Sequence, residues 1–126
     1  MARQIPVAQL VVEGKDDQHV IWALCNRHSI PETFAVVTPD DESGGIDELL
    51  NSIPIRLKIS GLRALGLVID ADQNLQGRWE AVCHRLRLSG YQELPDQPNS
   101  QGTIIERDRL PRVGIGSCRI INFQAC

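Results

Sequence analysis

The sequence has few aromatic residues, no CxxC pair and no long apolar run, and each absence excludes a class of protein. Aromatic residues make up 4% of the chain, which leaves no stacking platform for single-stranded bases. No stretch approaches the roughly 20 apolar residues that a membrane span needs. Without an apolar leader or a disulfide framework, we expect a soluble protein of the reduced cytoplasm with no membrane partner. The four cysteines are Cys25, Cys83, Cys118 and Cys126.

The chain also lacks a strong excess of either charge. Its formal net charge is −3, so any contact with nucleic acid has to be local or bridged by metal ions. With 126 residues, of which 42% are hydrophobic, the chain fits one compact domain spanning residues 1–126. The clearest pattern, and hence the expected core of the domain, lies at 7–90.

Short apolar runs alternate with helical patterns through this core. Such alternation predicts an α/β, Rossmann-like fold of three layers, with right-handed crossovers, a mostly parallel sheet of about four strands and helices on both faces. The expected elements are a strand at 7–12, a helix ending near 27, a strand at 34–38, a helix from 46, a strand at 64–70 and a helix ending near 89. In the helix from 46, Pro54 is expected to kink or restart the helix and Gly61 to stop it.

The pattern is weaker in the C-terminal part, 91–126. Residues 95–102 favour turns, and the next strand is either at 112–115 or at 119–123. The helix expected to cover a fourth strand does not follow. We therefore expect an irregular C-terminal part that is truncated or altered.

Helical spacing predicts which side chains pack inward. In the first helix the inward stripe is Val20, Ile21, Leu24 and Cys25, and Asp16 or Asp17 is a candidate cap. Both tryptophans are interpreted as packing residues. In the last helix the inward positions are Trp79, Val82, Cys83 and Leu86.

Two of the predicted strands end in carboxylates. Glu13 follows the first strand, and Asp70 and Asp72 follow the third. Ligands of open parallel sheets bind outside the carboxyl ends of the strands, so these three side chains are candidates for one Mg²⁺ site, at which Mn²⁺ can substitute. Such an ion suits phosphodiester chemistry, with Glu13 as a ligand or as general acid or base. The alternative is that these residues only cap helices.

Four further residues are candidates for phosphate binding. Gly14 and Lys15 stand at a helix start, where the helix dipole favours anions, and the lysine is a candidate catalytic residue as well. The alternative is a solvated lysine. Gly44 and Gly45 either let a backbone approach phosphate closely or serve only the turn. The acidic loop at 40–42 is interpreted as solvated.

Leu-Val-Val-Glu-Gly-Lys-Asp-Asp at 10–17, followed by Val-Ile-Asp-Ala-Asp at 68–72, resembles the Toprim domain. Topoisomerases, bacterial primases, OLD-type nucleases and small ribosomal-RNA maturases share that domain. The resemblance covers about residues 7–90 and is strongest to small stand-alone Toprim proteins of unknown function related to the OLD-type nucleases. It implies a general acid or base at Glu13, Mg²⁺ binding at Asp70 and Asp72, and DNA or RNA as partner.

The departures from better-known Toprim proteins narrow the expected function. A topoisomerase needs a tyrosine nucleophile on a separate domain, whereas Tyr91 is the sole tyrosine. A primase needs a zinc module that is absent. A phosphoacceptor receiver is disfavoured because Glu13 stands alone where an acidic pair is expected after the first strand, and because no lysine follows residue 90. A haloacid-dehalogenase phosphatase is disfavoured because its DxD motif follows the first strand, whereas Asp70 and Asp72 follow the third. We expect a nuclease-like enzyme or nuclease subunit; the alternative is a non-catalytic module that binds metal, nucleic acid, a protein partner or a second copy.

Overall fold

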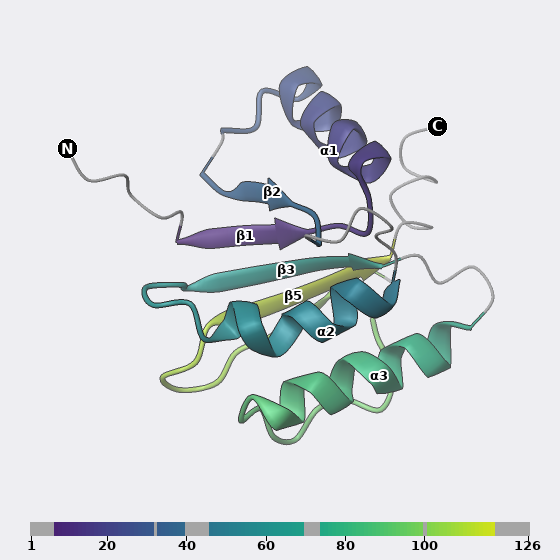
Figure 1. Cartoon of the computed structure of the whole chain (residues 1–126), viewed down its shortest axis with the longest axis vertical. Coiled ribbons are helices and arrows are strands. Elements are labelled where there is room, and N and C mark those ends of the chain that lie inside the picture. The colour runs from purple at the N-terminus through teal and green to yellow at the C-terminus, as the bar shows by residue number, and fades with distance from the viewer. Residues whose placement is uncertain (1–6, 32, 40–45, 70–73, 100, 118–126) are drawn as a thin grey trace.

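One five-stranded sheet and three helices make up the described part of the chain (Figure 1). The computed structural model describes residues 7–31, 33–39, 46–69, 74–99 and 101–117. The elements are β1 (Ala8–Val11), α1 (Lys15–Arg27), β2 (Ala35–Val37), α2 (Ile46–Leu57), β3 (Ala64–Ile69), α3 (Leu75–Leu88), β4 (Thr103–Ile105) and β5 (Arg112–Ser117).

The strand order is β2-β1-β3-β5-β4, and every neighbouring pair is parallel except β4 with β5. The predicted α/β class with a mostly parallel sheet is confirmed, and the sheet has five strands in place of about four. Of the two candidates for the next strand, 112–117 forms β5, while 119–123 lies outside the described residues. The sheet therefore continues past the core expected at 7–90.

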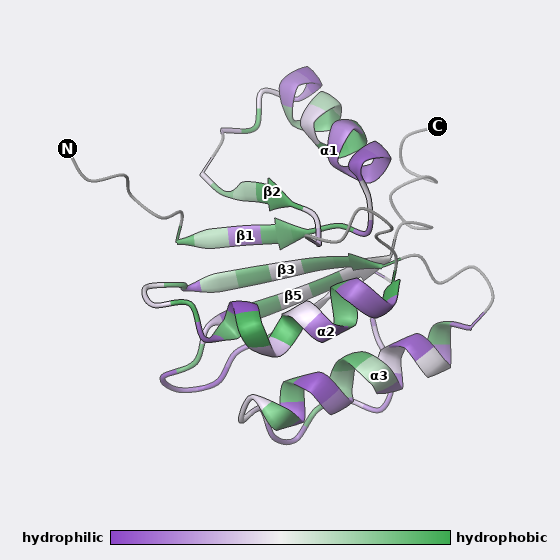
Figure 2. Cartoon of the chain, in the orientation of Figure 1, coloured by the Kyte–Doolittle hydropathy of each residue, from purple (hydrophilic) through white to green (hydrophobic). Residues whose placement is uncertain are grey.

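The helices lie on both faces of the sheet. Neighbouring residues of a strand point to opposite faces, and the two sets of buried side chains sort accordingly. Val11 and Leu67 belong to a core cluster with residues of α2 and α3. Val12 and Val68 belong to a second, smaller cluster that Ile21 of α1 packs against. The strands are largely apolar (Figure 2), as expected of a sheet with cores on both sides.

The helix α1 differs most from its prediction, because none of its residues is buried. Val20 is 46% exposed and Trp22 is 44% exposed, so both were wrongly assigned to the core. The physical reason is that α1 packs mainly on β2, an edge strand of three residues, which covers only a narrow side of the helix. Asp16 and Asp17 are not caps either. The helix begins at Lys15, so Gly14 is the N-cap residue and the two aspartates lie in the first turn.

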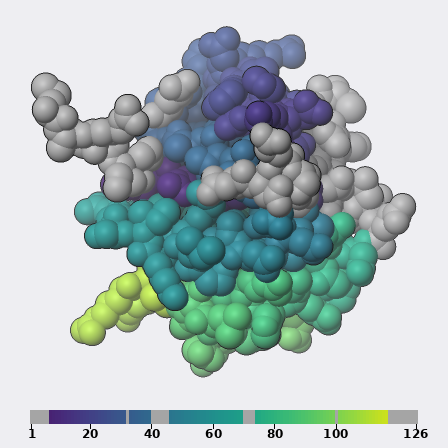
Figure 3. All heavy atoms as spheres, in the orientation of Figure 1, coloured from purple at the N-terminus to yellow at the C-terminus, as the bar shows by residue number. Residues whose placement is uncertain are grey.

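The helices α2 and α3 pack side by side on the larger core, on the face turned toward the viewer in Figure 3. The helix α2 runs through Pro54 without restarting and ends at Leu57, before Gly61, which adopts a φ of +84° in the following turn. The predicted inward residues of α3 are all buried; they are Trp79, Val82, Cys83 and Leu86.

On the α1 side, the sheet surface over β3 and β5 consists largely of glycines, at Gly66, Gly114 and Gly116. The side chain of Leu10 lies over Gly66 and that of Ile104 over Gly114. Ile104 is 63% exposed, and α1 is the sole described helix on this face.

Candidate metal centre

The strand order reverses between β1 and β3. The chain passes from β1 through α1 to β2 on one side, then through α2 back across β1 to β3 on the other. In open α/β sheets, such a switch point opens a crevice at the carboxyl ends of the strands. We call this end of the sheet, where β1, β2 and β3 all finish, the carboxyl edge.

Glu13 lies at the carboxyl edge, two residues after the end of β1, and is partly buried. The backbone N–H of the intervening Val12 donates to the carbonyl of Val37 at 3.0 Å, which holds this end of β1 against β2. On the other side, Val11 is in register with Leu67 of β3. The strand that leads into Asp70 is therefore the parallel neighbour of the strand that leads into Glu13.

Lys15 and Gly14 lie at the start of α1, as the sequence predicted, and the lysine is exposed. No side chain caps this helix at its N-cap residue. The φ of Gly14 is −151°, which is extended backbone that any residue adopts, and a Cβ atom there meets no other atom within 4 Å. Neither backbone conformation nor crowding by described atoms therefore requires a glycine at this position.

Four of the predicted site residues lie outside the described residues: Asp70, Asp72, Gly44 and Gly45. The acidic loop at 40–42 lies outside them as well. Among the residues that are described, no three side chains of histidine, cysteine, aspartate or glutamate come together as metal ligands. Of the predicted metal ligands, the structure thus describes Glu13, and it places this residue at the switch point.

Tyr91 is fully buried, and its hydroxyl donates to the carbonyl of Pro111 at 2.7 Å. A tyrosine held in this way is not presented to a phosphodiester as a nucleophile. The position of the sole tyrosine agrees with the exclusion of a topoisomerase mechanism.

The same residue allows a pH titration free of other tyrosines. Burial raises the pKa of Tyr91 from an ordinary 10.0 to about 12. We expect the folded protein to show no phenolate absorbance near pH 10, whereas the urea-unfolded chain ionises there. Between these two pKa values the unfolded state binds fewer protons, so the free energy of unfolding should fall as pH rises from 10 towards 12. Phenolate absorbance near pH 10 in protein that circular dichroism shows to be folded contradicts this burial.

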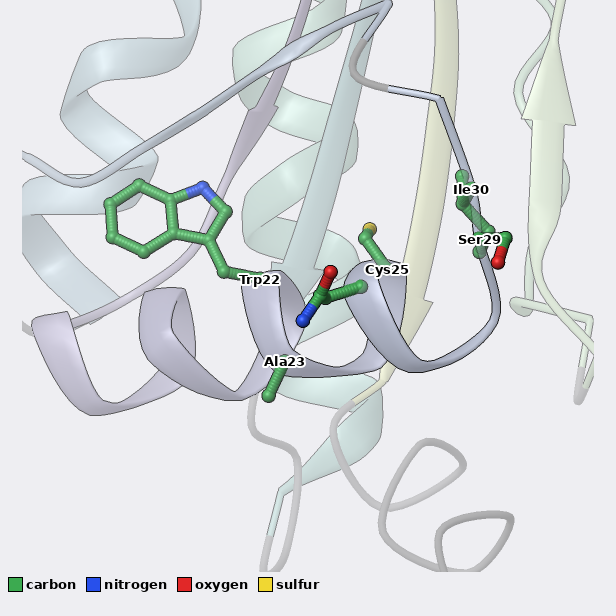
Figure 4. A pocket seen from close by; sticks show the side chains of 6 residues that line it. Trp22, Ala23, Cys25, Ser29 and Ile30 are labelled. Atoms are coloured by element: carbon green, nitrogen blue, oxygen red, sulfur yellow. The ribbon is translucent and has the colours of Figure 1, made fainter.

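A hollow of about 590 Å³ lies beside α1 and the turn that follows it (Figure 4). It is lined by Trp22, Ala23, Cys25, Asn26, Ser29 and Ile30. These residues belong to the second half of the helix and the turn, while Glu13 and Lys15 lie at its start. The hollow is therefore separate from the candidate metal centre.

Sequence reasoning missed a second hollow, which lies at the opposite end of the sheet. It is lined by Arg63, Ala64, Glu106, Arg107, Leu110 and Arg112. The available signal was that Arg63 and Arg112 both stand at the start of apolar strand runs. This signal becomes informative only when β3 and β5 are known to be neighbours, and the local sequence pattern does not show that they are.

The fold and the position of Glu13 define a doubly wound α/β protein with an acidic side chain at its switch point. A family model described as "Protein of unknown function (DUF3226)" matches residues 7–119, and the chain belongs to this family. No curated protein matches the chain, and no solved structure matches it. None of the described helices is long and apolar enough to cross a membrane.

Proposed function

We propose that the protein is a Toprim-like, Mg²⁺-dependent protein that acts on nucleic-acid phosphodiester bonds, as a nuclease or as a subunit of one. The observation that supports this proposal most strongly is the parallel pairing of β1 with β3, in the register Val11 with Leu67. It makes the strand before Glu13 and the strand before Asp70-Ala71-Asp72 direct neighbours, although they are far apart in the sequence.

The chemistry of the proposed ligands fits a hard divalent cation. Asp70, Asp72 and Glu13 offer carboxylate oxygens, which Mg²⁺ prefers, and Mg²⁺ keeps several waters when two or three carboxylates bind it. When bound, the ion supplies charge stabilisation for a phosphoryl oxygen and lowers the pKa of a coordinated water. In the general acid or base role, Glu13 exchanges a proton with the attacking water or the leaving oxygen.

The start of α1 supports the binding of a phosphate next to these carboxylates. The first N–H groups of a helix point out of its end and carry partial positive charge. Lys15 adds a positive charge in the first turn, which it shares with Asp16 and Asp17, and the space beside Gly14 is open among the described atoms. In the proposal, this end of α1 holds a phosphate of the substrate, and Gly44 and Gly45 are candidates for a second backbone contact.

A calorimetric titration with Mn²⁺ and Mg²⁺ tests the metal centre. We expect saturable binding to the wild-type protein and loss of that binding in both Asp70→Ala and Asp72→Ala, because each variant removes a proposed ligand. Asp108→Ala, which removes an exposed carboxylate from the connection between β4 and β5, is the matched control and should bind as the wild type does.

No binding to a wild-type protein that circular dichroism shows to be folded contradicts the proposal. Equal binding in Asp70→Ala and the wild type contradicts it too, because the aspartates are then helix caps and not ligands. Binding without cleavage of any DNA or RNA identifies the chain as a non-catalytic module.

A further inference from the structure

A hollow of about 380 Å³ lies at the end of the sheet opposite to the carboxyl edge. Three arginines line it, together with one carboxylate; we call it the arginine hollow and define it by Arg63, Arg107, Arg112 and Glu106. Arg63 immediately precedes β3 and Arg112 begins β5. Arg107 and Glu106 come from the connection between β4 and β5.

The backbone around the arginine hollow is held by hydrogen bonds. The N–H of Arg63 donates to the carbonyl of Val7 at 2.7 Å, and the N–H of Arg112 donates to the carbonyl of Arg63 at 2.8 Å. These hydrogen bonds hold the backbones at Arg63 and Arg112, on neighbouring strands, next to each other. A site on such a scaffold loses little conformational entropy in its backbone when a ligand binds.

Arg107 forms the wall of the hollow. Its guanidinium donates to three backbone carbonyls, of Gln92 at 3.0 Å, of Glu93 at 2.9 Å and of Glu106 at 2.7 Å. These contacts tie the β4–β5 connection to the segment that follows α3. The side chain is therefore used structurally, and its charge is held at a fixed place beside the hollow.

The other two guanidiniums keep unused donors. Arg112 forms an ion pair with Glu106 through Nε at 3.2 Å, and its two terminal nitrogens make no hydrogen bond with any described residue. The Arg63 side chain makes neither a hydrogen bond nor an ion pair with the described part of the chain. Both arginines line the hollow and are exposed, Arg112 with 62% of its side chain accessible, so their remaining donors are in reach of solvent and have no acceptor among the described residues.

We propose that the arginine hollow binds a phosphomonoester. Three guanidiniums against a single carboxylate leave an excess of positive charge in the hollow, which favours a dianion over a carboxylate ligand with one charge. A phosphomonoester carries nearly two charges at neutral pH and three acceptor oxygens. Guanidinium groups bind such oxygens through paired, charge-assisted hydrogen bonds.

A titration with inorganic phosphate in metal-free buffer tests this site. At a mildly alkaline pH, where inorganic phosphate is mainly a dianion, we expect saturable binding to the wild-type protein. Arg63→Gln and Arg112→Gln should each raise the Kd about tenfold, because each removes charged hydrogen bonds. Glu106→Gln should lower the Kd, since it removes the competing carboxylate and releases Nε of Arg112.

Arg109→Gln is the matched control, because Arg109 is exposed on the same connection and does not line the hollow. Thermal unfolding of each variant checks that the fold is intact. Absence of saturable binding to the wild type overturns the proposal. An equal loss in Arg109→Gln and Arg63→Gln overturns it as well, because binding then follows total charge and not contact.

Three competitors identify the source of the phosphomonoester. A nucleoside 5′-monophosphate that displaces inorganic phosphate supports a small ligand, and a 5′-phosphorylated oligonucleotide that does so supports a nucleic-acid end. An unphosphorylated oligonucleotide that competes equally well overturns the assignment to a monoester. The assay contains no metal and concerns the opposite end of the sheet, so its failure and the failure of the proposed nuclease function are distinguishable.

Discussion

We expect the Glu13→Gln variant to lose metal-dependent cleavage of nucleic acid by a factor of about 10² to 10⁴. Glutamine has nearly the same size and shape as glutamate, so it fills the same partly buried space after β1. It lacks the negative charge and does not exchange a proton at neutral pH. The substitution therefore removes the proposed acid–base group, and any ligand role, while leaving the end of β1 in place.

The measurement is the rate of nicking of plasmid DNA, and of cleavage of single-stranded DNA and RNA, with Mg²⁺ or Mn²⁺ present. The metal titration described above, repeated on Glu13→Gln, separates the two roles of the residue. If metal affinity is unchanged while the rate falls, Glu13 acts as acid or base; if both fall, it is a ligand.

Glu80→Gln is the matched control, because it makes the same exchange at an exposed position of α3. We expect this variant to cleave at the wild-type rate. The catalytic role of Glu13 is contradicted if Glu13→Gln cleaves at the wild-type rate while Asp70→Ala, purified in the same way, is inactive. The proposed metal centre would then not depend on Glu13.

The second large effect concerns stability. We expect Trp79→Ala to lower the free energy of unfolding by about 3 to 5 kcal/mol, the range found when a buried large aromatic residue is replaced by alanine. Trp79 is 1% exposed in the main core cluster, and its indole Nε1 donates to the carbonyl of Pro95 at 2.9 Å. The variant leaves a cavity between α3 and the segment that follows it.

Urea unfolding followed by circular dichroism measures this loss without relying on tryptophan fluorescence. Domains of this kind have only about 5 to 15 kcal/mol of stability, so a loss of this size can leave Trp79→Ala unfolded. Trp79→Phe therefore serves as a second variant that keeps most of the ring volume. Trp79→Phe should lose less stability than Trp79→Ala. Part of its loss comes from the missing hydrogen bond to Pro95, which is worth about 1 kcal/mol.

The other tryptophan provides the control. Trp22 is 44% exposed on α1, where its ring makes an edge contact with His19 at a centroid distance of 5.5 Å. We expect Trp22→Ala to cost about 1 kcal/mol or less, as substitutions outside the core do. If Trp22→Ala and Trp79→Ala lower the free energy of unfolding equally, the different burial of the two rings is contradicted.

Local patterns predicted the helices and strands up to the end of α3, because periodicity and turn residues depend on side chains only a few positions apart. They did not decide between the strand candidates after α3. A strand such as β5, with glycines at Gly114 and Gly116, has a weak pattern of its own. Its position between β3 and β4 gives it hydrogen-bond partners on both sides, and this pairing makes it a strand.

The same distinction explains the outcome for α1. The spacing of Val20, Ile21 and Leu24 correctly indicates a helix, and it suggests an inward stripe. How much of that stripe is buried depends on what lies opposite, and the three residues of β2 cover little of it. A helical pattern specifies the side that faces the sheet but not the width of the surface that covers it.

By itself, the sequence determined the alternation of strands and helices and the placement of carboxylates directly after two of the strands. The tertiary structure decided the strand order, and with it that β1 and β3 are neighbours at the switch point. It also decided that Trp22 is exposed while Trp79 is buried, and that Arg63 and Arg112 line one hollow. The physical reason is that these relations depend on hydrogen bonds and packing between segments that are distant along the chain, which no local pattern of residues specifies.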